Sequence, residues 1–489
     1  MHIHTRSISF ILFSVVVGLC QLSCRKMVTV PQPINSITTP EVFATDAQAN
    51  SAMAGIYTQL INGQLTFSNG YTTILGGMSS DEMYYYGTGD LNILAFSPNQ
   101  LLYSNSYTSS VWTSAYKIIY GTNSVIEGIA ASTSEGLTDS VRKELTSEAK
   151  FVRAFAYFYL TNFFGDVPLA MTIDFNATKN MARTPQQQVY QQIIKDLKEV
   201  QSLLPPDYSG VDTARSRIIP NRWAATALLA RVYLYTGDYA NAAAQATSII
   251  NNTALYNLVS DPNKVFLANS REAIWQLKQG STVIPFYSAT PEGYNILPSP
   301  RTTAVTHYCL TDNLLNAFEA GDLRRKSWID TTNNKPTGGV SAGLTYYPYK
   351  YKTGLFNAVS GAAPTEYYMV LRLAEIYLIR AEAEAGGATG GAAAAISDLN
   401  VIRSRAGLTG LSSALTQPEV IAAVAHERQV ELFAEWGHRW LDLKRTGQAH
   451  DVLSAISRKQ PWAGDYQLLY PIPPAEIQTD HFLVQNQGY

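Results

Sequence analysis

The sequence predicts a mostly α-helical protein, in which a TPR-like helical-repeat scaffold carries an irregular, loop-rich ligand-binding region. Two observations predict the scaffold. Apolar residues recur at steps of three and four along several segments, and one segment has the offsets of a tetratricopeptide (TPR) helix–turn–helix. A third observation predicts the irregular region, because helical periodicity fades between residues 252 and 370. We expect a single domain over residues 46–489, after a signal peptide and a tether.

The chain begins with a segment typical of a lipoprotein signal peptide. The run SISFILFSVVVGLCQLSC (7–24) carries no charge and is short for a membrane span, which needs roughly 20 apolar residues. A small residue precedes Cys24, which resembles the site at which a lipoprotein is cleaved and lipidated. We therefore interpret residues 1–23 as the signal peptide and 24–45 as the lipidated cysteine with its tether. An ordinary secretory signal and an uncleaved anchor are the alternatives.

Apolar periodicity predicts the first part of the scaffold, over about residues 46–251. In 141–163 the apolar residues fall on one face of a helix that ends at Gly165. In 189–204 the same pattern ends at a pair of prolines. Both segments are therefore predicted to be amphipathic helices.

The segment 221–251 carries the TPR signature. Gly237 makes the turn between two helices, and alanines let the helices approach closely. A second Ala-rich pair at 371–403 lies in the second part of the scaffold, about 366–450. One pair cannot bury its own apolar face, so several pairs must stack. The residues at TPR offsets are Leu229, Ala230, Tyr233, Gly237, Tyr239 and Ala242.

Residues 252–365 form the predicted irregular region. Gly, Pro, Asn, Thr and Tyr dominate there, and the segments read as long ordered loops. Long loops in a compact protein are usually functional or disordered, and the many aromatic residues argue against disorder. A C-terminal segment, 451–489, completes the domain.

Composition and motifs exclude several classes of function. The formal net charge is -2, without the basic excess that nucleic acid or a membrane surface requires. The segment HERQV lacks the second histidine of a zinc protease, because Val430 occupies its place, and neither a GxSxG elbow nor a P-loop occurs. We therefore expect no enzymatic activity, no cofactor and no metal site. Cys309 has no partner for an intramolecular disulfide and is expected in the core, as is Trp328.

The charged segment 427–447 has two interpretations. One is a partly buried ion-pair network that locks the C-terminal helices, and the other is a catalytic site. We favour the network, because apolar residues interleave with the charges. The residues spaced one helical turn apart are Glu427, Arg428, Glu431, Glu435, Arg439, Asp442 and Arg445.

The segment SSDEMYYYGTGDLN (79–92) contains three consecutive tyrosines. No regular element places three consecutive side chains on one side, and the Gly-Thr-Gly-Asp run that follows is typical of a turn. Tyrosine is also abundant overall, with 30 Tyr against 17 Phe and 7 Trp, and its flat face and polar tip suit wet recognition surfaces. We expect the three rings at or beside a loop, with at least one of them packed beneath it.

The chain resembles the SusD/RagB family, the outer-membrane nutrient-binding lipoproteins of Bacteroidota. The resemblance spans the mature chain and rests on segments that occur in the family's order. They are Cys24, SSDE (79–82), EAKFVRAFAYFYLTNFFGDVPL (148–169), RWAATALLARVYLYTGDYANA (222–242), LRLAEIYLIRAEA (371–383), LNVIRSRAGL (399–408), ERQVELFAEWGHRWLDLKRTG (427–447) and YPIPPAEIQTDHFLVQNQGY (470–489).

The resemblance implies a SusD-like fold and a non-catalytic function. It implies binding of oligosaccharides or polysaccharides and their delivery to a SusC-like TonB-dependent outer-membrane transporter. It also implies a lipid anchor in the outer membrane, with the protein facing the extracellular side. The alternatives are the same architecture binding peptides, as in the RagB branch, a pure TPR assembly scaffold, and a hydrolase.

A sugar ring has an apolar face and a rim of hydroxyls, so its site needs aromatic platforms beside a few polar groups. In the family the site combines the early loop with aromatic residues of the irregular region, and Tyr346, Tyr347 and Tyr349 are reserve candidates there. The predicted ligand-binding residues are Asp81, Tyr84, Tyr85, Tyr86, Asp90, Asn92, Tyr287 and Tyr294.

Overall fold

The computed structural model describes residues 39–63, 65–208, 217–299, 306–334 and 343–489. The predicted signal peptide, Cys24 and the tether up to residue 38 lie outside the described residues. The short helix α2 (Thr39–Val42) belongs to an N-terminal unit, and Phe43–Tyr489 forms a second, compact unit. Of the described helices, none is both long and apolar enough to span a membrane.

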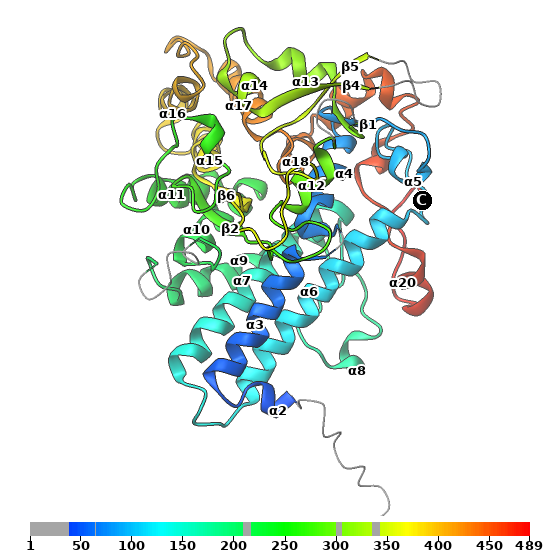
Figure 1. The fold of residues 1–489 in the computed structure, drawn as a ribbon, viewed down its shortest axis with the longest axis vertical. Coiled ribbons are helices and arrows are strands. Elements are labelled where there is room, and N and C mark those ends of the chain that lie inside the picture. The colour runs from blue at the N-terminus through cyan, green and yellow to red at the C-terminus, as the bar shows by residue number, and fades with distance from the viewer. Residues whose placement is uncertain (1–38, 64, 209–216, 300–305, 335–342) are drawn as a thin grey trace, which may run out of the picture. The chain divides into compact units, whose positions relative to one another are not determined.

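Helices dominate the unit Phe43–Tyr489 (Figure 1), which confirms the predicted fold class. Its α-helices are α3 (Asp46–Ile61), α4 (Thr72–Ser79), α5 (Leu91–Leu94), α6 (Ser106–Ala131), α7 (Asp139–Phe164), α8 (Phe175–Thr178), α9 (Gln186–Leu203), α10 (Arg222–Tyr235), α11 (Tyr239–Ile250), α12 (Pro291–Ile296), α13 (Asp312–Ala317), α14 (Leu323–Trp328), α15 (Leu373–Ala385), α16 (Gly391–Arg405), α17 (Gln417–Leu432), α18 (His438–Arg445), α19 (Ala449–Ser454) and α20 (Pro474–Thr479). Shorter helical turns are η1 (Phe67–Tyr71), η3 (Pro262–Lys264), η4 (Ser457–Lys459) and η5 (Asp465–Leu468).

The two helices predicted from periodicity are α7 and α9. The hydroxyl of Thr138 caps the N-terminus of α7 by accepting from the backbone N–H of Val141. Gly165, at φ +76°, ends the same helix in a conformation that favours glycine. Helix α9 ends just before Pro205, as the sequence predicts.

The TPR prediction is confirmed by two stacked helix pairs. Helices α10 and α11 pack together around Gly237, whose φ of +73° makes the turn. Helices α15 and α16 form the second pair, and α11 packs against α15. Ala230 and Ala242 are fully buried where the first pair makes contact. Stacking therefore buries the faces that a single pair would leave exposed.

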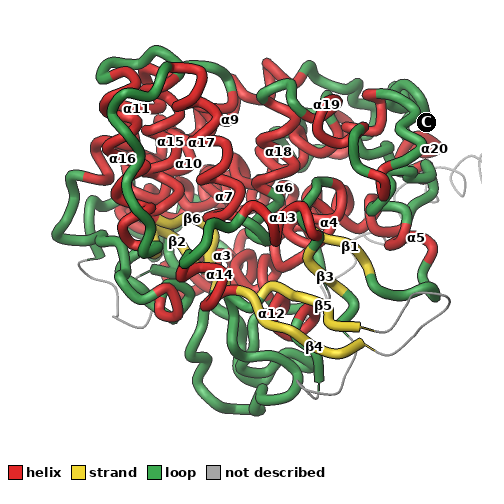
Figure 2. The backbone as a smooth tube through the Cα atoms, turned by 90° about the horizontal axis from the view of Figure 1, so that it is seen from above, coloured by secondary structure: helices red, strands yellow, loops and turns green. Residues whose placement is uncertain are grey.

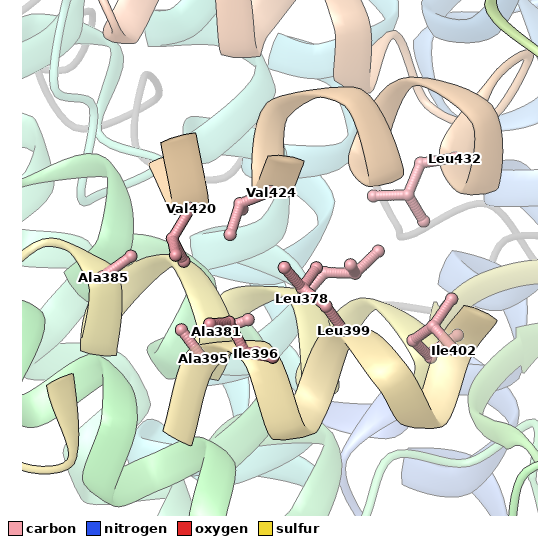
Figure 3. Close-up of a cluster of buried hydrophobic side chains, with 11 residues drawn as sticks. Leu378, Ala381, Ala385, Ala395, Ile396, Leu399, Ile402, Val420, Val424 and Leu432 are labelled. Carbon is pink, nitrogen blue, oxygen red and sulfur yellow. The ribbon is translucent and has the colours of Figure 1, made fainter. Parts of the chain in front are cut away.

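Helix α17 closes the core of the second pair (Figure 3). Val420 and Val424 of α17 point toward Leu378 and Ala381 of α15 and toward Leu399 of α16, and all five are buried. Alanines at the helix contacts keep the backbones close, so branched side chains of the third helix fill the remaining space.

Short strands lie in and beside the region that the sequence predicts as loops. They form three two-stranded antiparallel sheets, which Figure 2 shows on the side of the unit where loops gather. Periodicity does not reveal strands of three to six residues, and for two of the three pairs the partner strand is also distant in sequence. The pairs are β1 (Met83–Tyr85) with β3 (Tyr308–Leu310), β2 (Ala273–Leu277) with β6 (Tyr368–Arg372), and β4 (Ile329–Asn334) with β5 (Gly343–Pro348).

A buried ion-pair network surrounds Glu431 of α17, as predicted for the charged segment. The Glu431 carboxylate, fully buried, lies 3.0 Å from Arg324 and 2.6 Å from Arg372, and it also pairs with Arg405. These three arginines hold the pKa of Glu431 well below its usual range, although burial alone would raise it. The network thus joins α14, β6 and α16 to α17.

Most partners in the network come from distant segments rather than from the same helix. Asp442 and Arg445 pair within α18 at 2.8 Å, as their spacing predicts. Glu435 instead pairs with Arg372, at 2.7 Å, and with Lys350. A buried charge needs complete compensation, which one helical neighbour does not supply. Trp328 and Cys309 are both fully buried, as predicted.

Replacing Glu431 with glutamine tests the network. Glu431→Gln keeps the shape but leaves the three arginines short of one buried negative charge, so we expect a loss of about 3–5 kcal/mol in the free energy of unfolding. Urea unfolding measures this loss. Glu144→Gln on the exposed face of α7 is the matched control, with an expected change within about 0.5 kcal/mol. Equal stability of the two variants would contradict the role given to Glu431.

Candidate ligand-binding site

Strand β1 divides the three consecutive tyrosines between two faces. Tyr85 lies opposite Tyr308 of β3, and Tyr84 lies opposite Cys309. Successive side chains of a strand point to opposite faces, so Tyr84 and Tyr85 meet different surroundings. Tyr86 is only 2% exposed, and its backbone N–H donates to the carbonyl of His307 at 2.6 Å.

Burial of Tyr86 corrects the expectation that all three rings serve as platforms. Tyr86 follows the last residue of β1, and its ring is buried in the core. Tyr84 and Tyr85 stay partly exposed. Burial of Tyr86 agrees with the expectation that at least one of the three rings packs beneath the loop.

Four partly exposed tyrosines gather on the Tyr85 side of β1, and we call them the tyrosine surface. The rings of Tyr71 and Tyr107 meet edge to face at 5.3 Å. The rings of Tyr85 and Tyr308 lie 5.6 Å apart, and His307 packs on Tyr85 at 5.4 Å. Aromatic contacts of this kind hold each ring in place. The four residues are Tyr71 at the end of η1, Tyr85 of β1, Tyr107 of α6 and Tyr308 of β3.

Asp90 supplies the negative charge beside the tyrosine surface. Its carboxylate accepts from the backbone N–H groups of Asn92, at 3.0 Å, and Ile93, at 3.2 Å, and so caps α5. The hydroxyl of Tyr107 donates to the same carboxylate at 2.5 Å. Burial, and then the charge of Asp90, raise the pKa values of Tyr71, Tyr85 and Tyr107. At Tyr308, too, Asp90 contributes to a raised pKa, after burial and the neighbouring tyrosines.

The Gly-Thr-Gly run allows Tyr85 to lie against the loop. A Cβ atom on Gly87 would come within 2.7 Å of Cε1 of Tyr85, closer than side chains allow. Gly87 therefore provides the space in which the ring rests. The sequence predicts a turn here, and the structure adds that its first glycine supports an aromatic ring.

The structure places Asp81 and Asn92 in different surroundings, and only those of Asp81 depart from the expectation. Asp81 is 4% exposed and receives the guanidinium of Arg439, with Nε at 2.8 Å and Nη2 at 2.9 Å. Its carboxylate is therefore already compensated, which corrects the expectation of a free hydrogen-bond partner for a ligand. Asn92 is exposed beside Asp90, and its carbonyl accepts from Asn105 at 2.8 Å.

Tyr287 and Tyr294 lie in a different segment from the tyrosine surface. Tyr294 belongs to α12, which packs against η1, the element that ends in Tyr71. Its ring meets Phe286 edge to face at 5.3 Å. Tyr287 has a left-handed φ of +50°, and both tyrosines are half-buried. Within the described residues, neither ring stacks on the tyrosine surface, and their role as ligand contacts stays a prediction.

The reserve candidates on and after β5 differ in exposure. Tyr347 is fully buried and donates to Asp330 at 2.9 Å, so it is unsuited to contact a ligand. Tyr349 is half-buried beneath Lys352, whose Nζ lies 3.8 Å from the ring centre. Tyr346 is half-buried and lines a cavity that Tyr84 also lines.

The buried carboxyl group of Glu292 joins α12 to β6. Tyr368 donates its hydroxyl hydrogen to Glu292 at 2.9 Å. Burial, the largest cause, raises the pKa of Glu292 to about 8, so the group is mainly protonated at neutral pH. A neutral carboxyl group costs little to bury once it is hydrogen-bonded.

Sequence analysis did not predict Tyr71, Tyr107 and Tyr308 as residues of the site. Each ring comes from a different element, and only the fold brings them to Asp90. Among the described residues, no group of three or more His, Cys, Asp or Glu side chains is arranged to hold a metal ion. The surface instead offers flat aromatic faces, phenolic hydroxyls and one carboxylate, which is chemistry for binding.

Comparison with known proteins identifies the family. A model described as "Starch-binding associating with outer membrane" matches residues 35–234, and a model described as "SusD family" matches residues 316–489. The chain belongs to the SusD/RagB family. The SusD-like protein P2 of Formosa agariphila is 27% identical over 423 residues, which cover 79% of this chain and 81% of that protein. The starch-binding protein SusD of Bacteroides thetaiotaomicron is 24% identical over 442 residues, or 73% and 74% of the two chains.

Solved structures of SusD proteins share the fold. A SusD superfamily protein from Bacteroides vulgatus has a TM-score of 0.77 at 23% identity, covering 91% of this chain and all of the other. A laminarin-binding SusD-like protein has a TM-score of 0.73 at 24% identity, with the same coverage. The SusD architecture thus extends over nearly the whole chain.

The state of Glu292 leads to a pH prediction. Its folded-state pKa of about 8 lies above an unfolded value of about 4.3. Between these values the native state binds the extra proton, so the free energy of unfolding falls as pH rises, by up to about 1.4 kcal/mol per pH unit. Glu292→Gln cannot ionise and should lack this part of the pH dependence.

Urea unfolding of the wild type and Glu292→Gln at several pH values between about 5 and 8 measures the difference. Glu144→Gln is the control and should follow the wild-type profile. Parallel profiles for the wild type and Glu292→Gln would mean that Glu292 ionises normally in the folded protein.

Proposed function

We propose that this chain is a non-catalytic, lipid-anchored SusD protein of the outer membrane that binds oligosaccharides or polysaccharides. In this proposal it faces the extracellular side and passes its ligand to a SusC-like TonB-dependent transporter. One observation carries the binding part: four partly exposed tyrosines pack in two ring pairs, and one of them, Tyr107, donates to the carboxylate of Asp90.

The tyrosine surface suits the amphipathic faces of a sugar. Stacking of a nucleic-acid base on an aromatic ring, the nearest measured analogue, contributes about 1–3 kcal/mol. The rings of the surface already pack on one another, and Tyr107 is hydrogen-bonded to Asp90. Little side-chain entropy is therefore lost when a ligand binds.

The arrangement of carboxylates favours binding over hydrolysis. A glycosidase of the usual kind needs two carboxylates about 5–9.5 Å apart across the scissile bond. Asp90 is held by two backbone N–H groups and a phenol, and it is the only acidic group that acts on all four tyrosines in the described part of the chain. This supports a site that holds sugars without cleaving them.

The anchor and the partner rest on sequence and family. The signal segment ending at Cys24 supports lipidation. The relative named a starch-binding SusD and the structure of a laminarin-binding SusD-like protein support glycans as ligands rather than peptides. Membership of the SusD/RagB family supports delivery to a transporter.

Affinity electrophoresis against a panel of plant, host and microbial polysaccharides tests the site. Tyr85→Ala removes the ring that contacts both Tyr308 and His307. We expect affinity for the retarding glycan to fall about 5- to 150-fold, which corresponds to about 1–3 kcal/mol.

Tyr120→Ala is the matched control, because Tyr120 is a 58% exposed tyrosine of α6 outside the tyrosine surface. If Tyr85→Ala and the wild type are retarded equally, the tyrosine surface is not the glycan-binding site. Binding of peptide mixtures without binding of any glycan would favour the peptide alternative.

Asp90 also leads to a prediction about ligand charge. A fixed negative charge among the tyrosines should repel uronate and sulfate groups, so we expect preference for an uncharged glycan over an acidic one. Asp90→Asn keeps a residue that caps helices equally well and should reduce this preference. Paired affinity electrophoresis on a neutral glucan and a polyuronate measures it. Asp174→Asn at the cap of α8 is the control, and an unchanged preference in Asp90→Asn would contradict the role of the charge.

A further inference from the structure

A cavity lies on the Tyr84 side of β1, opposite the tyrosine surface. It has a volume of about 190 Å³, and we call it the Arg458 pocket. Its walls come from β1, from the start of α13, from β5 and from the turn that contains Arg458. The residues used below are Ser97, Tyr84, Asp312, Asn313, Tyr346 and Arg458, all of which line it.

Two buried charged residues form the fixed floor of the Arg458 pocket. Asp81 is paired with Arg439, as described above. Lys459 is 2% exposed and donates to the carbonyls of Met78, at 2.6 Å, and Ser79, at 2.9 Å. The charge of Asp81 is thus compensated by Arg439, whereas Lys459 is held by backbone carbonyl oxygens and burial lowers its pKa well below the usual range. Both side chains are engaged by the protein, which makes this floor rigid.

The rim of the pocket, in contrast, carries polar groups without protein partners. Arg458 is exposed, and its guanidinium carbon lies 4.0 Å from the ring centre of Tyr84. Stacking on the ring holds the guanidinium plane while leaving its N–H groups available. In the described parts of the chain, the side chains of Arg458, Asp312 and Asn313 form no ion pair or hydrogen bond with the protein, and the buried hydroxyl of Ser97 has no hydrogen-bond partner.

The chemistry of the rim matches a sugar. Arg458 donates hydrogen bonds, Asp312 accepts them, and Asn313 does both. The charges of Arg458 and Asp312 have opposite sign, so an uncharged ligand with many hydroxyl groups fits better than an anion. Ligand pockets for drug-sized molecules measure about 300–1,000 Å³, so a cavity of about 190 Å³ has room for one sugar ring.

We propose that the Arg458 pocket is a second carbohydrate subsite, which takes a single uncharged glycosyl unit. This inference rests on the proposed function, because the tyrosine surface is taken as the first subsite. A polysaccharide offers many equivalent units and can occupy both subsites, whereas a short oligosaccharide occupies one at a time. Two linked binding events raise the apparent affinity well above that of either subsite.

The test measures binding of soluble starch and laminarin, and of their trisaccharides, to the mature protein. Arg458→Ala and Asn313→Ala alter exposed side chains and should not impair folding. We expect Arg458→Ala to lower affinity for the bound polysaccharide at least about tenfold. Two trisaccharides should bind per wild-type chain and one per Arg458→Ala chain.

Lys179→Ala is the matched control, since it removes an exposed cation over the ring of Phe175, outside both subsites. Two results would each overturn the proposal that the Arg458 pocket binds a sugar. One is a stoichiometry of one trisaccharide per chain in both the wild type and Arg458→Ala. The other is an unchanged affinity for the polysaccharide in Arg458→Ala and Asn313→Ala. The proposals for the two subsites can be contradicted independently of each other. If glycan binding is unchanged in Tyr85→Ala and lost in Arg458→Ala, the tyrosine surface is not a subsite and the Arg458 pocket is one. Absence of binding to every glycan would overturn both.

Discussion

The compensation of buried charge around Glu431 constrains how the two parts of this SusD protein fit together. Glu431 lies on a scaffold helix, whereas Arg324 and Arg372 belong to α14 and β6 of the loop-rich side. Removing two opposite charges from water costs more than their attraction returns unless each charge finds full hydrogen bonding. The network therefore forms completely only when α14, β6, α16 and α17 occupy their native positions together.

The same network extends toward the candidate site. Glu435, one turn after Glu431, pairs with Lys350 just beyond β5. Strand β5 packs against β3, and β3 pairs with β1, which carries Tyr84 and Tyr85. Arg439 of α18 reaches the same region through Asp81, next to β1. Charged residues of the C-terminal helices thus fix the strand that presents the tyrosines.

Local pattern predicts much of the scaffold and little of the site. Helices α7 and α9 follow from apolar periodicity, and helices α10 and α11 follow from the offsets of a TPR helix pair, because both signals lie within the segment itself. Strand β1 has three residues, and its partner β3 lies more than two hundred residues away. Its existence, and with it the division of the tyrosines between two faces, depends on a pairing that no local pattern contains.

The site residues show the same limit. Asp90 is recognisable from the sequence as a turn residue, but its bond to Tyr107 spans 17 positions, and that of Asp81 to Arg439 spans 358. The first bond makes Asp90 the centre of an aromatic surface, and the second withdraws Asp81 from ligand binding. A sequence reveals which residues have suitable chemistry, whereas the fold decides which of them is already engaged.

The alternation of one short strand explains how consecutive, chemically identical residues come to face different surroundings. Tyr85 joins an open group of rings around a negative charge, while Tyr84 supports a guanidinium at the edge of a small polar cavity. An open aromatic surface gains a few kilocalories per stacked ring and excludes little water, so each contact alone is weak. Weak sites on one rigid support suit a polymer, because a repeating ligand dissociates from one site while another still holds it. If the proposed subsites bind glycan, the rigidity imposed by the buried charges and the openness of the tyrosine surface would both favour a long glycan over a short one.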